Sequence, residues 1–299
     1  MTTTTNSAAG NSGLARAVPR LSVLATILES ARQTLVMLRY RRILWVAPIG
    51  LLLLFALAFV LAGTARSRSD GAHLYSVFAW WGLATVVMPW ATLFLGVQAV
   101  HGELEDRTSQ YLFLRPVHRV PLFLGKWLAI AAVSSALACC SAAALYVAVA
   151  SREDLWPDGR EPWLLVSFCI VLGLGATAYS AVAVFLAATF RRPLAWAAFF
   201  VVGLQMLAAN LPVSAGLRQL TITDPLRRMT LDLIEPSRRL ARALWPAERN
   251  EALSIENGTG AFLLEFGSPL CSLLILVVVC LTLGCWQYAR TEYESRNRD

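Results

Sequence analysis

Long uncharged segments constrain this chain more than any other feature. Six windows, each of more than 20 residues, contain no Asp, Glu, Lys or Arg. They are residues 43–65, 74–100, 127–151, 163–190, 193–217 and 266–289. About 20 apolar residues are enough for a helix to cross the hydrocarbon core of a bilayer. Because backbone polar groups in lipid must be satisfied within the segment, these windows are expected to be helices. The sequence therefore predicts an all-α, polytopic membrane protein with six transmembrane helices.

The composition agrees with this interpretation. Hydrophobic residues make up 57% of the chain and charged residues only 15%, against about 25% charged residues in soluble domains. The formal net charge is +7, which could indicate nucleic-acid binding. However, the basic residues flank the apolar windows and form no continuous basic face. Anchoring at the membrane edge is the simpler explanation, and no nucleic-acid partner is expected.

The distribution of basic residues predicts the orientation. With the N-terminus inside, 15 of the 26 basic residues lie in inner segments and four in the first two outer loops. The positive-inside rule favours this arrangement, with both termini cytoplasmic in a plasma (inner) membrane. The last outer loop, 218–265, does not fit this rule, because it carries seven Arg. It also carries seven acids, and long loops influence orientation weakly.

Two segments at the N-terminus precede the first window. Residues 1–20 are small and polar, without the apolar core of a secretory signal, and are expected to be a disordered cytoplasmic tail. Residues 21–42 are expected to form an amphipathic interfacial helix. Its apolar positions recur every three or four residues, at Leu21, Leu24, Leu28, Ala31, Leu35 and Leu38. The alternative is an ordinary cytoplasmic helix packed on protein.

The remaining segments outside the windows are also expected to have simple roles. In the outer loop 218–265, Leu226, Met229 and Leu233 recur at helical spacing, which predicts short outer-surface or re-entrant helices. Residues 290–299 are expected to be a cytoplasmic tail. Residues 43–289 would then form a single transmembrane domain.

The sequence gives little support for chemistry carried out by the chain itself. No ionisable Asp, Glu, Lys or Arg lies inside the windows, although proton-coupled transporters usually place such residues there. The six Cys and three His have no zinc-ligand spacing, so no metal or cofactor is expected. Gly125-Lys126 lacks the remainder of a phosphate-binding loop. No catalytic residue is therefore expected, and a membrane enzyme is the weakest of the functional classes considered.

The segment 101–126, between the second and third windows, is the strongest candidate site. It has acids at one end, then an aromatic and apolar step, then Arg and Pro residues and finally Gly-Lys. Leu104, Thr108, Tyr111 and Arg115 fall at helical spacing, and Pro116 would end that helix. This predicts a short helix at the inner membrane surface. Its alternative is a solvated loop.

The same residues resemble the first cytoplasmic loop of the membrane-spanning subunits of type-2 ABC transporters. The matching acids are Glu103 and Glu105, and the matching Thr is Thr108. An Arg-Pro-Val-x-Arg element is matched by Arg115, Pro116, Val117 and Arg119, and a Leu-Gly-Lys element by Leu124, Gly125 and Lys126. Arg107 departs from the Gly that the family usually has there. The motif covers about 25 residues, whereas the six-span plan covers most of the chain.

The resemblance implies a permease subunit, expected to be an exporter, with ATP hydrolysis on a separate ATP-binding subunit. The segment would be the coupling loop that docks on that subunit. Its expected contacts are Glu103, Glu105, Asp106, Thr108, Tyr111, Arg115 and Pro116, with Arg119 and Lys126 as membrane-interface anchors. Six spans are half a transporter, so a dimer with a second permease copy or homologue is implied. The alternative function is a non-transporting membrane scaffold or accessory protein.

Overall fold

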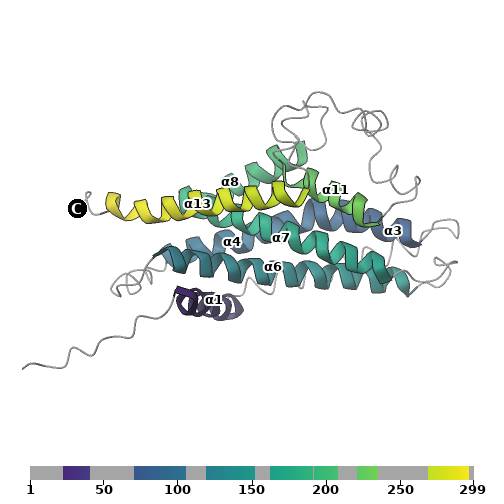
Figure 1. Ribbon diagram of the computed structural model, residues 1–299, viewed down its shortest axis with the longest axis horizontal. Helices are drawn as coiled ribbons and strands as arrows, with labels where there is room; N and C mark the ends of the chain where they lie inside the picture. The colour runs from purple at the N-terminus through teal and green to yellow at the C-terminus, as the bar shows by residue number, and fades with distance from the viewer. Residues whose placement is uncertain are drawn as a thin grey trace, which may run out of the picture.

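The structure is a computed structural model that describes seven stretches of the chain. These are residues 23–40, 71–105, 119–151, 162–190, 192–207, 221–234 and 269–295. Every regular element in these stretches is helical and none of them contains a strand. Figure 1 shows the long helices lying side by side along one axis. The expected all-α fold is confirmed.

Four helical segments are long and apolar enough to cross a membrane. The first is one continuous rod made of α3 (Gly71–Val77), η2 (Phe78–Val87) and α4 (Met88–Glu105). The others are α6 (Arg119–Ala150), α7 (Pro162–Thr189) and α13 (Pro269–Ser295). They correspond to the second, third, fourth and sixth windows of the sequence, so these four segments have the length and composition that were predicted for spans.

The other two predicted spans are not established. The first window, 43–65, lies outside the described residues. The fifth window, 193–217, is described only in its first part, as α8 (Pro193–Phe199) and η4 (Phe200–Leu207). Its apolar helix, Pro193–Gly203, is shorter than a typical span. Phe190 stacks on Trp196 with ring centroids 4.5 Å apart, across the short turn between α7 and α8.

Helix α7 is at the centre of the bundle. It packs against α4, α6 and α13, and many of its buried positions carry small residues: Gly175, Ala176, Ala178, Ser180, Ala181 and Ala183. Small side chains allow helices to approach closely in lipid. The larger of two core clusters surrounds α7, with the fully buried Tyr75, Phe168 and Tyr179 among its members. The rings of Tyr75 and Phe168 meet edge to face, with centroids 5.4 Å apart.

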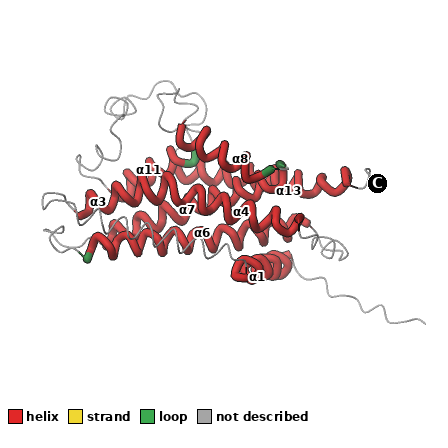
Figure 2. The backbone as a smooth tube through the Cα atoms, turned by 180° about the vertical axis from the view of Figure 1, so that it is seen from behind, coloured by secondary structure: helices red, strands yellow, loops and turns green. Residues whose placement is uncertain are grey.

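The predicted amphipathic segment forms helix α1 (Val23–Tyr40). Figures 1 and 2 show that it lies at the end of the bundle where α13 terminates, and that it crosses the bundle axis. Its buried positions are Ser30, Ala31, Thr34 and Leu38. The predicted apolar face is therefore split, because Leu24 and Leu28 are 72% and 64% exposed. A face of mostly small residues packs on α6, and a separate leucine-rich face stays uncovered by the described residues.

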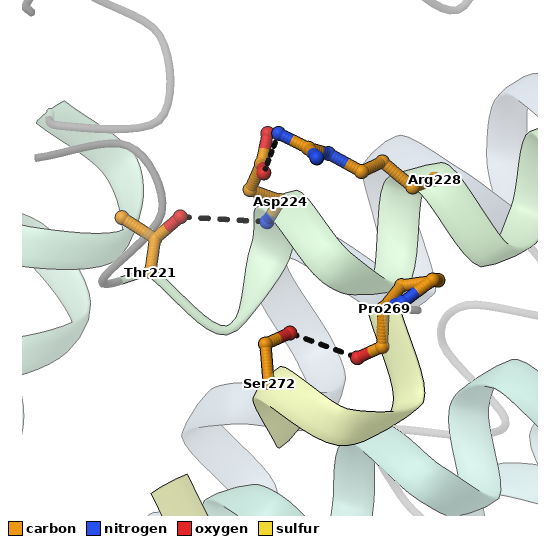
Figure 3. A network of polar contacts seen from close by, with 5 residues as sticks. All are labelled: Thr221, Asp224, Arg228, Pro269 and Ser272. Atoms are coloured by element: carbon orange, nitrogen blue, oxygen red, sulfur yellow. Dashed lines mark hydrogen bonds and ion pairs between the residues drawn. The ribbon is translucent and has the colours of Figure 1, made fainter. Parts of the chain in front are cut away.

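Helix α11 (Thr223–Ile234) comes from the long segment that was predicted to be an outer loop. It packs along α7 and against α13. At Gly175 of α7, an added Cβ would lie 2.8 Å from Leu226 Cδ1, so the Leu226 side chain packs directly on α7 at this glycine. The Thr221 hydroxyl accepts a hydrogen bond from the Asp224 N–H (3.4 Å), and Asp224 forms a 2.9 Å ion pair with Arg228. Figure 3 shows this end of α11 beside Pro269 and Ser272 of α13.

Candidate functional site

The structure describes the two flanks of the predicted coupling loop. Helix α4 continues to Glu105, so Glu103 and Glu105 lie in its last turns. Helix α6 begins at Arg119 and contains Lys126. The other predicted contact residues, Asp106, Thr108, Tyr111, Arg115 and Pro116, lie outside the described residues. Their role in docking stays a prediction, as does the helix expected between them.

A second, smaller core cluster fixes the flanks of this loop. It brings together Leu38 of α1, Val100 of α4, Phe123 of α6 and Ala187 of α7, all buried. Phe123 is completely buried only four residues after the start of α6. The chain on either side of the loop is therefore held in a packed junction of four helices. A displacement of the loop would have to move or deform this junction, because packed interiors transmit strain.

Gly125 allows α1 to lie directly on α6. A Cβ added at Gly125 would lie 2.5 Å from the Ile27 carbonyl oxygen and 2.7 Å from Ser30 Cβ. Any larger residue at this position would push α1 away. The Ser30 hydroxyl also donates a 3.0 Å hydrogen bond to the Leu122 carbonyl oxygen. Contact and hydrogen bond together attach α1 to the first turns of α6, and we call this contact the α1–α6 clasp.

The C-terminal helix completes the junction. An added Cβ on Gly284 of α13 would lie 2.7 Å from Phe123 Cζ, and the Phe123 ring packs on Tyr288 with centroids 5.5 Å apart. Lys126 is only 7% exposed, and its Nζ lies 6.0 Å from the centroid of the Tyr288 ring. Lys126 was predicted to be an anchor at the membrane interface. The structure places it inside the junction, against α13, while only the backbone of Arg119 is described.

Sequence reasoning missed three participants in this junction: Ser30, Gly125 as a contact residue, and Tyr288. One signal was present in the sequence. Ser30, Ala31 and Thr34 are small residues spaced by three and four along α1, which is a pattern typical of close helix contacts in membranes. The leucines of the same helix are more conspicuous, and they lie on the exposed face beside the one that packs on α6. Nothing in the sequence marks Tyr288 as a neighbour of Lys126.

What the junction offers is a packed contact between helices. No group of three or more metal-ligating side chains is found among the described residues. On α1, the ion pair of Glu29 with Arg32 at 3.8 Å is well exposed and so contributes little stability. On α13, the Arg290 guanidinium lies 3.8 Å from the Trp286 ring centroid, a pair that suits the boundary between lipid and water.

Comparison with known proteins agrees with the motif and the fold. No curated protein sequence matches the chain. The family model described as "ABC-2 family transporter protein" matches residues 28–293, which include every described helix except the first residues of α1 and the last of α13. Such a match covers far more than half of the chain. Four apolar membrane-length helices and this match together identify an integral multi-pass membrane protein. The chain belongs to the ABC-2 family of transporter proteins, a permease family that implies an ABC-type ATP-binding partner.

Proposed function

We propose that this chain is the permease subunit of an exporter that couples ATP hydrolysis on a separate subunit to substrate movement across the inner membrane. The coupling loop between α4 and α6 docks on that subunit. The observation that carries the proposal is the packed junction behind the loop. Phe123, Gly125 and Lys126 join the loop's α6 flank to α1 and α13 within one turn of helix. A displacement of the loop is therefore transmitted to α1, α6 and α13 together.

The orientation of α1 supports the proposed topology. This helix crosses the bundle axis (Figure 1) at the same end of the bundle as the C-terminal end of α13. One face packs on α6, and Leu24, Leu28 and Leu35 lie on an adjacent exposed face. A helix of this kind lies in the membrane interface with its apolar face in the acyl region. Both termini are then cytoplasmic, and the interfacial helix, coupling loop and ATP-binding subunit share the inner side.

We further infer that the working unit is a dimer. The sequence accounts for at most six spans, and the two halves of an ABC transporter move relative to each other as ATP is bound and hydrolysed. A second copy of this chain or a homologous permease supplies the other half. Among the described helices, α13 has the most exposed surface, with 11% of its most apolar window buried. Lipid or another permease can cover this surface.

The first test is to purify the tagged chain from its native host in mild detergent and identify what accompanies it. We expect a near-stoichiometric ATP-binding subunit. Glu105→Lys and Pro116→Ala should each reduce recovery of that subunit at least about tenfold while leaving membrane insertion unchanged, because a charge reversal at a docking surface opposes binding. Glu256→Lys, in the segment expected outside, is the matched charge-reversal control and should recover the subunit normally.

Two outcomes would contradict the proposal. Full recovery of the ATP-binding subunit by both loop variants would remove the coupling role of the loop. An abundant, well-folded preparation without any ATP-binding subunit would favour the non-transporting scaffold instead. In that case the match of the segment 103–126 to the coupling loop would have no functional meaning.

A further inference from the structure

A buried polar node joins three helical segments in the middle of the bundle. The side-chain oxygen of Gln205, on η4, accepts three hydrogen bonds. They come from the Tyr179 hydroxyl of α7 (3.2 Å), the Thr223 hydroxyl (2.7 Å) and the Thr223 backbone N–H (3.3 Å) at the start of α11. Gln205 is 2% exposed and Tyr179 is 1% exposed. We call these three residues the Gln205 node.

The orientation of the Gln205 amide follows from its partners. A backbone N–H can only donate, so the atom facing Thr223 must be the amide oxygen. The amide nitrogen then points elsewhere, and it is buried without a hydrogen-bond partner among the described residues. A buried amide without a partner is unfavourable. Within the described residues, its two N–H groups have no acceptor.

The node lies well inside the membrane-spanning region. Tyr179 is about 25 Å along α7 from Pro162, and the whole helix is about 42 Å long, at about 1.5 Å per residue. Helix α11 runs antiparallel to α7. Thr223, at the start of α11, shares Gln205 as a hydrogen-bond partner with Tyr179, which lies in the second half of α7. Near the end of α11, the Leu233 carbonyl accepts a 3.2 Å hydrogen bond from the indole of Trp163, at the start of α7. The N-terminal end of α11 is therefore deep in the bundle and its C-terminal end is near the start of α7.

The surroundings select the kind of oxygen that can bind there. The first N–H groups of α11 are engaged, Thr223 by Gln205 and Asp224 by Thr221 (Figure 3). Asp224 and Arg228 form an ion pair, and Arg227 has an interaction of its own. The carboxylate of Asp224 also offsets the positive end of the helix dipole. Among the described residues, an anionic group would find no free countercharge, whereas a neutral acceptor oxygen needs none.

The side chains around the node are apolar. Val201 of η4 and Leu226 of α11 are buried in the same core cluster as Tyr179. A molecule that reaches the Gln205 amide must therefore bring an apolar body along with its oxygen. A neutral lipid-like molecule with an ester or amide carbonyl meets both requirements, and a small hydrated solute meets neither.

We propose that the Gln205 amide is a binding site for the carbonyl oxygen of a neutral amphipathic molecule. The site lies between α7, η4 and the N-terminal end of α11. The proposal rests on the proposed function, since the bound molecule is the transported one or a competitor for its route. Tyr179 and Thr223 act as positioning residues, because they hold the amide oxygen and thereby aim the nitrogen.

The test uses the full chain with its ATP-binding subunit in lipid nanodiscs. The probe is a diacylglycerol that carries a photoactivatable diazirine on one acyl chain, and the labelled peptides are identified by mass spectrometry. Wild-type protein should be labelled in η4, α7 or α11. Gln205→Leu should reduce that labelling about tenfold, the effect of losing one buried hydrogen bond to the ligand. Gln98→Leu, at another glutamine in a membrane-length helix, should leave it unchanged.

Two further variants separate ligand binding from helix packing. Tyr179→Phe and Thr223→Val each remove one hydrogen bond to the amide oxygen and keep the amide nitrogen. Both should retain labelling within about threefold of wild type, because two donors to the oxygen remain. If they lose labelling as fully as Gln205→Leu, the node is a packing contact and the binding site is wrong.

Equal labelling of wild type and Gln205→Leu would also overturn the proposal, and would leave water as the partner of the amide. Recovery of the ATP-binding subunit is measured on every sample. If wild type and Gln205→Leu are labelled equally while the ATP-binding subunit is still bound, only this binding site is refuted. Absence of the subunit from wild type refutes the proposed function instead.

Discussion

Helices α7 and α13 have almost the same length and are both strongly apolar, yet they have opposite roles in the bundle. The most apolar window of α7 is 67% buried within the described residues, and that of α13 is 11% buried. The difference lies in side-chain size. Helix α7 carries Gly and Ala on several faces, whereas α13 exposes Val and Leu. In lipid, close contact between helices depends on small residues and on packing more than on hydropathy.

The largest effect is expected from truncating a central aromatic side chain. Phe168→Ala on α7 should lower the free energy of unfolding by about 3 kcal/mol, the low end of the usual range, because lipid and not water surrounds the opened bundle. The unfolding midpoint in detergent micelles, followed by intrinsic fluorescence, measures this. Val166→Ala, on the exposed side of the same helix, is the control. Equal effects of the two changes would mean that α7 is not the central helix.

The next effect concerns the contact between α4 and α7. The Cβ of a residue at Gly96 would collide with the Cβ of Ala183, so Gly96→Val should cost about 2 kcal/mol through overpacking. Gly173→Val on α7 is the matched control, because an added Cβ there meets nothing within 4 Å. The same unfolding measurement applies to both. A Gly96→Val protein as stable as Gly173→Val would show that α4 and α7 are not packed this closely.

A smaller and more local effect is expected at the α1–α6 clasp. Gly125→Ala should weaken this contact by about 1 kcal/mol and speed backbone hydrogen exchange in residues 23–40 about fivefold, because the added methyl group pushes against Ile27 and Ser30. Exchange in α7 should not change. Gly203→Ala, whose Cβ would meet the Phe199 ring at an ordinary 3.6 Å, serves as control. Faster exchange throughout the bundle would argue against a local clasp.

The smallest effect is expected on the exposed side of α13. Val278 is 56% exposed, and Val278→Ala should change the free energy of unfolding by less than about 0.5 kcal/mol, as surface substitutions usually do. Gly284→Val on the same helix, at the contact with Phe123, should cost more. If Val278→Ala destabilised the isolated chain as much as Gly284→Val does, α13 would be more buried than the structure shows.

The sequence was enough to predict four membrane-length helices, because length and lack of charge are local properties. It also predicted α1 as a helix and α11 as a short helix within the long loop. It could not predict which face of α1 is covered, since Leu24 and Leu28 are as apolar as any core residue. It also could not predict that Lys126 lies against Tyr288. Its neighbour Tyr288 is far away in the sequence, and only the packing of α6 on α13 brings the two together.

The Gln205 node shows the same limit. Gln205 lies inside an uncharged window, but no local pattern connects it to Tyr179 or Thr223. The connection depends on α11 running back into the bundle beside α7. Hydrophobic periodicity predicted a short helix there. It did not predict how deep in the bundle that helix lies, because outer-surface and re-entrant helices have similar patterns.

The two wide-turned segments, η2 and η4, have a consequence for how this chain tolerates changes in length. A π-helical turn holds one more residue than the α-helical turn that it replaces. Deleting a single residue within Phe78–Val87 or Phe200–Leu207 can therefore narrow a turn and leave the faces of the flanking helix in place. The same deletion in α7 would rotate everything beyond it by about 100°. Insertions and deletions among natural variants should therefore collect in η2 and η4 and avoid the central helix.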